Sequence, residues 1–142
     1  MSKSYFTINE LCKSDTAKVL HIDNTPTESV RKNLLNLIDF LNNLREAWGS
    51  PIKVTSGYRC PKLNSAVGGS KTSAHLKGNA ADLQPMNGQM KEFKKFVVEY
   101  LKDNNCSWDQ CLLERSAFAE WIHIGLYSNS GQQRKQIKNL NV

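Results

Sequence analysis

Apolar residues in the first half of the chain repeat with the period of an amphipathic α-helix. They occupy the positions Val30, Leu34, Leu37, Ile38, Leu41, Leu44 and Trp48. Upstream, Thr25-Pro-Thr-Glu28 has the spacing of a capping box with proline at the first helical position, and Gly49 follows the last apolar residue. The pattern predicts a long helix that begins after Thr25, ends before Gly49 and packs on a sheet.

Shorter helical patterns flank this segment. Residues Met90 to Leu101 carry apolar side chains at helical spacing and predict a second helix that covers the core. A capping-box spacing at Thr7 predicts a short helix from Ile8 to Lys13, and we expect a further helical piece after Ser14. Proline near its start and a glycine pair after its end predict a helix over Cys60 to Val67.

Four segments have the pattern of β-strands, and they are Ile52–Thr55, Asn79–Gln84, Trp108–Glu114 and Trp121–Leu126. In the second segment, alternation places Asp82 on the face opposite Ala81 and Leu83. In the fourth, His123 lies opposite three aliphatic residues. If these two strands belong to one antiparallel sheet, Asp82 and His123 converge above the same surface.

The length of 142 residues is that of one domain, which we assign to residues 1–142 with an N-terminal helical segment over 1–24. Residues 127–142 form a polar tail rich in Gln, Asn, Ser and Lys, and we expect a loose end or a poorly packed final turn there. The N-terminus lacks an apolar signal core, and no apolar run reaches the length of a membrane span. We therefore expect a protein made in the cytoplasm without a signal peptide.

The chain is 39% hydrophobic and 23% charged, which is a soluble globular balance. A net charge of +6 would suit an anionic partner, but the basic residues are scattered and no aromatic residues interleave with them, so we expect no nucleic-acid partner and no membrane partner. In a reducing compartment, the four cysteines are expected to be free thiols.

Three side chains have the chemistry of metal ligands. His75 and Asp82 lie seven positions apart around a glycine, and His123 follows downstream in Glu120-Trp-Ile-His123. A mononuclear zinc hydrolase needs three protein ligands, an open position for water and a carboxylate that accepts a proton. The sequence offers this set, although two unrelated and inert histidines would give the same pattern.

Three motifs along the chain carry a family resemblance. Ser56-Gly-Tyr-Arg59, the stretch from Ser73 through His75 to Asp82, and Glu120-x-x-His123 resemble, in this order, the motifs of the zinc D-alanyl-D-alanine carboxypeptidase-like peptidases. That group includes the vancomycin-resistance D,D-dipeptidases and phage endolysins that cut L-alanyl-D-glutamate bonds. The resemblance implies an α+β fold of the Hedgehog and D,D-peptidase type, with an antiparallel sheet and helices packed on one side.

The resemblance also implies a role for each matched residue. It assigns one zinc ion to His75, Asp82 and His123, and the roles of general base and acid to Glu120. It assigns stabilisation of the substrate carbonyl to Arg59. We expect two further residues of these motifs, Ser73 and Tyr58, to bind substrate.

The position of Glu120 conflicts with this assignment. Glu120 and His123 are three residues apart, so on a regular strand their side chains face opposite sides. Either Glu120 projects from the turn before the strand, or the strand is bulged at Trp121. The alternative base is Glu114, at the end of the preceding strand.

Together, the residues and the resemblance predict a zinc metallopeptidase. The expected substrates are peptidoglycan stem peptides or other peptides that contain D-amino acids, cut as a D,D-carboxypeptidase or as an endolysin-like endopeptidase. We expect a monomer, with release to the cell wall by a phage lysis system as one route to the substrate. Two alternatives stay open, a non-catalytic zinc-containing module that binds cell wall or protein, and a peptidase acting on ordinary peptides.

Overall fold

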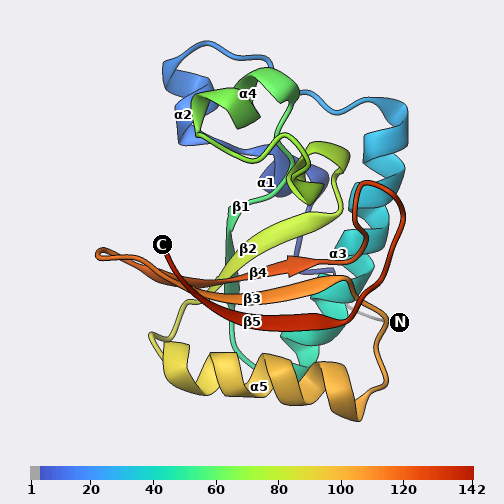
Figure 1. The fold of residues 1–142 in the computed structure, drawn as a ribbon, viewed down its shortest axis with the longest axis vertical. Helices are drawn as coiled ribbons and strands as arrows, with labels where there is room; N and C mark the ends of the chain where they lie inside the picture. Colours follow the sequence, from blue (N-terminus) through green and yellow to red (C-terminus); the bar gives the residue numbers. More distant parts are fainter. Residues whose placement is uncertain (1–3) are drawn as a thin grey trace.

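A computed structural model describes residues 4–142, in which helices precede and interrupt a sheet (Figure 1). The helices of this part of the chain are α1 (Ile8–Cys12), α2 (Asp15–Val19), α3 (Glu28–Trp48), α4 (Pro61–Ala66), the 3-10 helix η1 (Ala74–Lys77) and α5 (Met90–Asp103). The strands are β1 (Ile52–Ser56), β2 (Ala80–Pro85), β3 (Gln110–Arg115), β4 (Glu120–Gly125) and β5 (Gln136–Asn141). The α+β class expected from the resemblance is confirmed.

The long helix α3 begins two residues later than its capping box predicted. Thr27 is the N-cap, and its hydroxyl accepts a hydrogen bond from the Val30 amide at 3.3 Å. Thr25 instead donates its hydroxyl to the Asp23 carboxylate at 2.6 Å, so it is not available to cap the helix. The predicted C-terminus is confirmed, because Gly49 adopts a left-handed φ of 80° and donates its amide to the Arg45 carbonyl.

The sheet has the strand order β1-β2-β4-β3-β5 and is mixed rather than wholly antiparallel. Strands β1, β2, β4 and β3 pair antiparallel in that order, whereas β5 runs parallel to β3. The expectation of a purely antiparallel sheet is therefore wrong at one edge. Strand β5 lies in the segment 127–142 that was expected to be a loose tail, and that expectation is also wrong.

Polar contacts hold β5 in place. The buried Asp109 carboxylate accepts hydrogen bonds from Arg134 Nε at 2.7 Å and Nη2 at 2.9 Å. The Trp108 indole donates to the Gln136 carbonyl at 3.1 Å, and the Gln110 side-chain amide donates to the Gln136 side-chain oxygen at 3.0 Å. Because these contacts are polar and distant in sequence, apolar periodicity does not predict the strand.

One face of the sheet forms the core with the two long helices. Helices α3 and α5 contact each other, and α5 also contacts β2 and β4. The buried sheet residues on this face include Ala81 and Leu83 of β2 and Ile122 and Ile124 of β4. The opposite face is left for α4 and η1, which Figure 1 shows on the other side of the strands from α5. Within residues 4–142, no helix is both long and apolar enough to cross a membrane.

Helix α3 allows a matched test of this packing. Leu37 is 0% exposed in the core, and Leu35 on the same helix is 50% exposed. We expect Leu37→Ala to lower the free energy of unfolding by about 2–5 kcal/mol, because it leaves a cavity. The same exchange at Leu35 should change it by less than about 0.5 kcal/mol. Urea denaturation of both variants measures the difference, and equal losses would contradict the placement of α3.

Candidate metal centre

Strands β2 and β4 place an aspartate directly opposite a histidine. In their antiparallel register Asp82 pairs with His123, and the Asp82 Oδ1 and His123 Nδ1 atoms are 3.1 Å apart. The neighbours of Asp82 along β2, Ala81 and Leu83, are buried in the core, so Asp82 points to the opposite face. The prediction that these two side chains share a face is confirmed.

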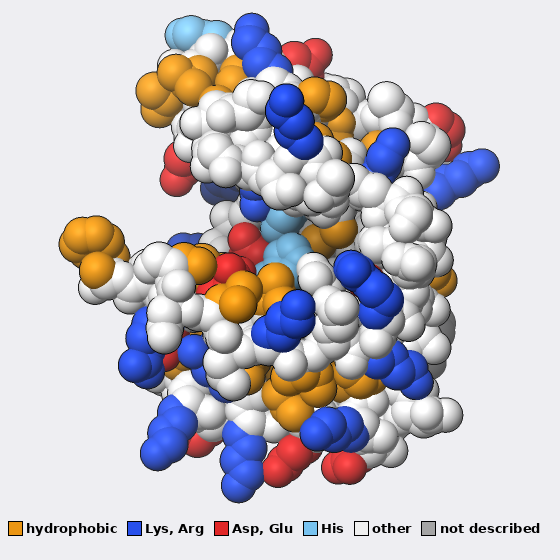
Figure 2. Space-filling view, viewed as in Figure 1, with side chains coloured by type: hydrophobic (Ala, Val, Ile, Leu, Met, Phe, Trp, Pro, Cys, Tyr) orange, Lys and Arg blue, Asp and Glu red, His pale blue; other side chains and the backbone are white. Residues whose placement is uncertain are grey.

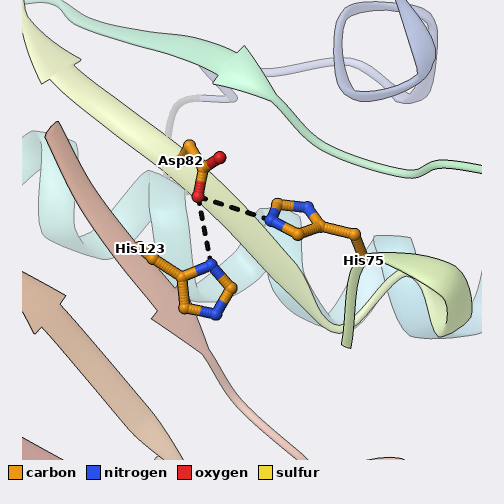
Figure 3. A group of neighbouring side chains, drawn as sticks. All are labelled: His75, Asp82 and His123. Atoms are coloured by element: carbon orange, nitrogen blue, oxygen red, sulfur yellow. Dashed lines mark hydrogen bonds and ion pairs between the residues drawn. The ribbon is translucent and has the colours of Figure 1, made fainter. Parts of the chain in front are cut away.

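His75 reaches the same carboxylate from η1. The Ser73 hydroxyl caps this short helix and accepts the His75 amide at 3.2 Å. His75 Nδ1 lies 2.7 Å from the Gly57 carbonyl oxygen, which can only accept, so this nitrogen carries the proton. The other ring nitrogen, Nε2, is 3.4 Å from Asp82 Oδ1, and Figure 3 shows the carboxylate between the two imidazoles.

Gly57 makes this acceptor possible. A Cβ atom at Gly57 would lie 2.2 Å from the Leu11 carbonyl oxygen, which is far inside contact distance. The neighbouring Tyr58 amide donates to that same oxygen at 2.7 Å, so the chain is fixed close to α1. Only a glycine fits at this approach, and its carbonyl holds the His75 ring in one orientation.

The three side chains fit a divalent metal ion. One donor atom from each of His75, Asp82 and His123 lies within 4.8 Å of the others. Two imidazoles and one carboxylate are a ligand set that suits zinc and related ions, and three protein ligands leave a position for water. The predicted ligands are therefore brought together in a geometry that can hold a metal.

The environment keeps Asp82 ionised. Burial by itself raises the pKa of this carboxyl group, but hydrogen bonds from His123 and His75 and the charges of both rings lower it more. The net effect holds the pKa of Asp82 well below its usual range. Asp82 is thus a carboxylate, the form that binds metal, throughout the neutral range.

A cavity of about 660 Å³ opens beside these ligands. It is lined by η1, by the loop after α4, by the face of the sheet that carries Asp82 and His123, and by parts of the C-terminal segment. Figure 2 shows histidine and acidic side chains at the bottom of a hollow between the sheet and the region of α2 and α4. The three ligands thus line a cavity that opens to solvent, as a catalytic metal site requires, although His75 itself is buried.

Arg59 lines the cavity and is held from several sides. Its Nε donates to the Ser56 hydroxyl at 3.2 Å and its Nη1 to the Asn64 side-chain oxygen at 3.0 Å. Gly69 leaves room for this pair, since a Cβ there would lie 2.1 Å from that oxygen. Burial lowers the pKa of Arg59, while the nearby Asp82 and Glu114 carboxylates raise it. The net effect lowers the pKa, but an arginine stays protonated at neutral pH, so the guanidinium carries its charge close to the candidate ligands.

The structure does not bring Glu120 to this cavity. Strand β4 pairs with β3 in continuous register from Glu120 to Gly125, so no bulge reverses its side chain. The Glu120 carboxylate instead binds Lys94 Nζ of α5 at 3.0 Å and Arg115 at 2.9 Å. Both cations lower the pKa of Glu120 through these hydrogen bonds. The geometry contradicts the assignment of Glu120 as the base.

Glu114 occupies the position that the assignment needed. It lines the cavity from β3, and its register partner on β4 is Trp121. The Trp121 indole donates to Glu114 Oε2 at 2.8 Å, which leaves Oε1 without a bond to the described residues. The alternation of Leu112 and Glu114 opposite His123 and Trp121 is the sequence signal for this placement.

Of the two residues expected to bind substrate, Ser73 and Tyr58, only Ser73 lines the cavity. Ser73 lines the cavity, as predicted, and also positions His75. Tyr58 is buried in the hydrophobic core and does not line this cavity, which argues against its assignment to substrate binding. Sequence reasoning missed Asp109 and Arg134, which line the cavity but belong to no recognisable motif.

Comparison with protein families agrees with this site. A family model described as Peptidase M15 matches residues 4–125. The chain belongs to the peptidase M15 family. Its members are metallopeptidases, so the predicted family and the peptidase class are confirmed. The match contains the three candidate ligands, Arg59 and Glu114, and it ends at the last residue of β4. No curated protein matched the chain.

The three histidines of the chain allow a matched test of metal binding. We expect His75→Asn and His123→Asn each to weaken the binding of a divalent transition metal by at least about 100-fold, because each removes a ligand. His21→Asn is the control, since His21 has a left-handed φ of 54° that asparagine tolerates and is outside the ligand group. Calorimetric titration with Zn²⁺ measures the affinities. Equal affinities in all three variants would contradict the site.

Proposed function

We propose that this chain is a zinc-dependent peptidase that hydrolyses amide bonds in peptidoglycan stem peptides or other peptides with D-amino acids. The observation that carries the proposal is the group of His75, Asp82 and His123 at a cavity whose walls also hold Glu114 and Arg59. Family membership supports the reaction class. The resemblance of the three sequence motifs supports the substrate class.

His75, Asp82 and His123 would hold the zinc ion. When bound there, zinc polarises the scissile carbonyl and lowers the pKa of a water molecule towards 7. The Gly57 carbonyl fixes the ring of His75, and Asp82 stays ionised between the two imidazoles. These contacts hold the donor atoms close together before the ion binds, which reduces the cost of binding it.

Glu114 is the proposed general base and acid. Its Oε2 is fixed by Trp121, its Oε1 has no bond to the described residues, and the residue lines the cavity shared with the ligands. This oxygen would accept the proton of the attacking water and return it to the leaving amine. Glu114 thus takes the role that the resemblance gives to Glu120. It lies two residues after Leu112, the residue that pairs with His123 across the two strands.

Arg59 is the proposed oxyanion donor. Two of its nitrogens are occupied by Ser56 and Asn64, so the plane of the guanidinium is set before substrate binds. A preorganised donor of this kind contributes about 2–4 kcal/mol to stabilisation of the transition state. The cavity of about 660 Å³ lies within the range of ordinary ligand pockets and accommodates a short peptide segment.

The two glutamates provide a matched test of the base. We expect Glu114→Gln to lower kcat by at least about 100-fold while zinc stays bound, because the amide cannot accept the proton. Glu120→Gln should keep kcat within a few-fold, since Glu120 pairs with Lys94 and Arg115 outside the cavity. Peptide hydrolysis and zinc content are measured for both variants. The reverse pattern would restore Glu120 as the base.

The substrate class is tested on intact cell-wall material. Purified sacculi are incubated with the zinc-loaded protein, and the soluble products are analysed by mass spectrometry. We expect new amino termini at one type of bond in the stem peptide, which also distinguishes endopeptidase from carboxypeptidase action. Binding to sacculi without release of fragments would support a binding module instead. Cleavage of ordinary L-peptides alone would overturn the proposed substrate class.

A further inference from the structure

The C-terminal segment contributes a wall of the cavity. The region that matches the family ends at residue 125, whereas Ser128 and Arg134 line the cavity from the connection between β4 and β5. Strand β5 anchors this connection by pairing with β3, which carries Glu114. A segment outside the family match thus lies beside the proposed catalytic carboxylate.

Arg134 is fixed on this wall by a carboxylate. Asp109 is 2% exposed, and it accepts Nε of Arg134 at 2.7 Å, Nη2 at 2.9 Å and the backbone amide at 3.1 Å. This bidentate pair fixes the plane of the guanidinium. The Arg134 side chain is nevertheless 42% exposed, so part of it faces the solvent of the cavity.

The exposed part of Arg134 has the geometry of a carboxylate receptor. Asp109 occupies the edge formed by Nε and Nη2, and no described residue bonds to Nη1. The end of the fork, between Nη1 and Nη2, therefore keeps two roughly parallel N–H groups that match the two oxygens of a second carboxylate.

We infer that Arg134, positioned by Asp109, is a specificity residue that binds a free carboxylate of the substrate peptide. The inference rests on the proposed peptidase function and narrows its substrate class to peptides with an acidic group near the scissile bond. The carboxylate can be that of the peptide C-terminus or that of a side chain. Both present the same two oxygens to the guanidinium.

A peptide series separates these sources. Each stem-like peptide is prepared with a free or amidated C-terminus and with an acidic side chain or its amide. We expect the zinc-loaded protein to prefer one acid over its amide by about 10- to 100-fold in kcat/KM. The pair that shows the preference identifies the source of the carboxylate. Hydrolysis without preference for any acid would overturn the inference.

Variants distinguish recognition from loop anchoring. Arg134→Gln should reduce the acid-to-amide ratio towards 1, whereas a merely structural role would lower both rates together and preserve the ratio. Lys135→Gln, which removes a neighbouring charge that lies 5.7 Å over the Trp108 ring, is the control and should keep the ratio of the unaltered protein. If Arg134→Gln does not fold, the double variant Asp109→Asn/Arg134→Gln replaces the ion pair with a neutral one.

Binding measurements test Arg134 apart from turnover. In the Glu114→Gln background, calorimetry with the same peptides should show tighter binding of the preferred acid than of its amide, and Arg134→Gln should remove the difference. Acid-selective binding without hydrolysis in the unaltered protein would support the role of Arg134 and refute the peptidase. Failure of all acid peptides to bind would overturn the inference.

Discussion

The register between β2 and β4 sets Asp82 opposite His123, and a shift of one residue would turn the carboxylate into the core. Buried neighbours on both strands, among them Leu83 and Ile122, fix this register because they must face α3 and α5. The packing of the core therefore determines where the ligands lie. Placing His75 next to this pair needs a second constraint, which the Gly57 carbonyl supplies from the end of β1.

The site is surrounded by polar side chains whose partners are other polar side chains. Asn64 accepts from Arg59 and donates to the Ser70 carbonyl, and Asp109 is paired with Arg134. Such networks destabilise the folded state when some of their polar groups lack a partner, and they are rigid when every group is bonded. Here they fix two guanidinium groups on different walls of one cavity, beside the ligands and Glu114. The chemistry proposed for the cavity depends on this rigidity, because preorganised charges need not rearrange during reaction.

Local patterns in the sequence predicted most elements and the ligand group. Alternation placed Asp82 and His123 on one face, and the same rule exposed the conflict at Glu120, which the regular β4 strand holds at Lys94 while Glu114 lines the cavity. Strand β5 and the contact between Asp109 and Arg134 were not predictable, because a polar pair 25 residues apart leaves no periodic signal. The burial of Tyr58 was missed for a related reason, since only the fold shows that it lies in the hydrophobic core and does not line the cavity.

We propose that one cavity holds both a metal bound by His75, Asp82 and His123 and a proton acceptor from β3. A crystal structure of the zinc-loaded protein, with anomalous diffraction at the zinc edge, would locate both. We predict a single strong anomalous peak within bonding distance of His75 Nε2, Asp82 and His123, with Glu114 facing the ion and Glu120 still bound to Lys94. A peak at another group of residues, or a Glu120 side chain turned towards the ion, would contradict this account.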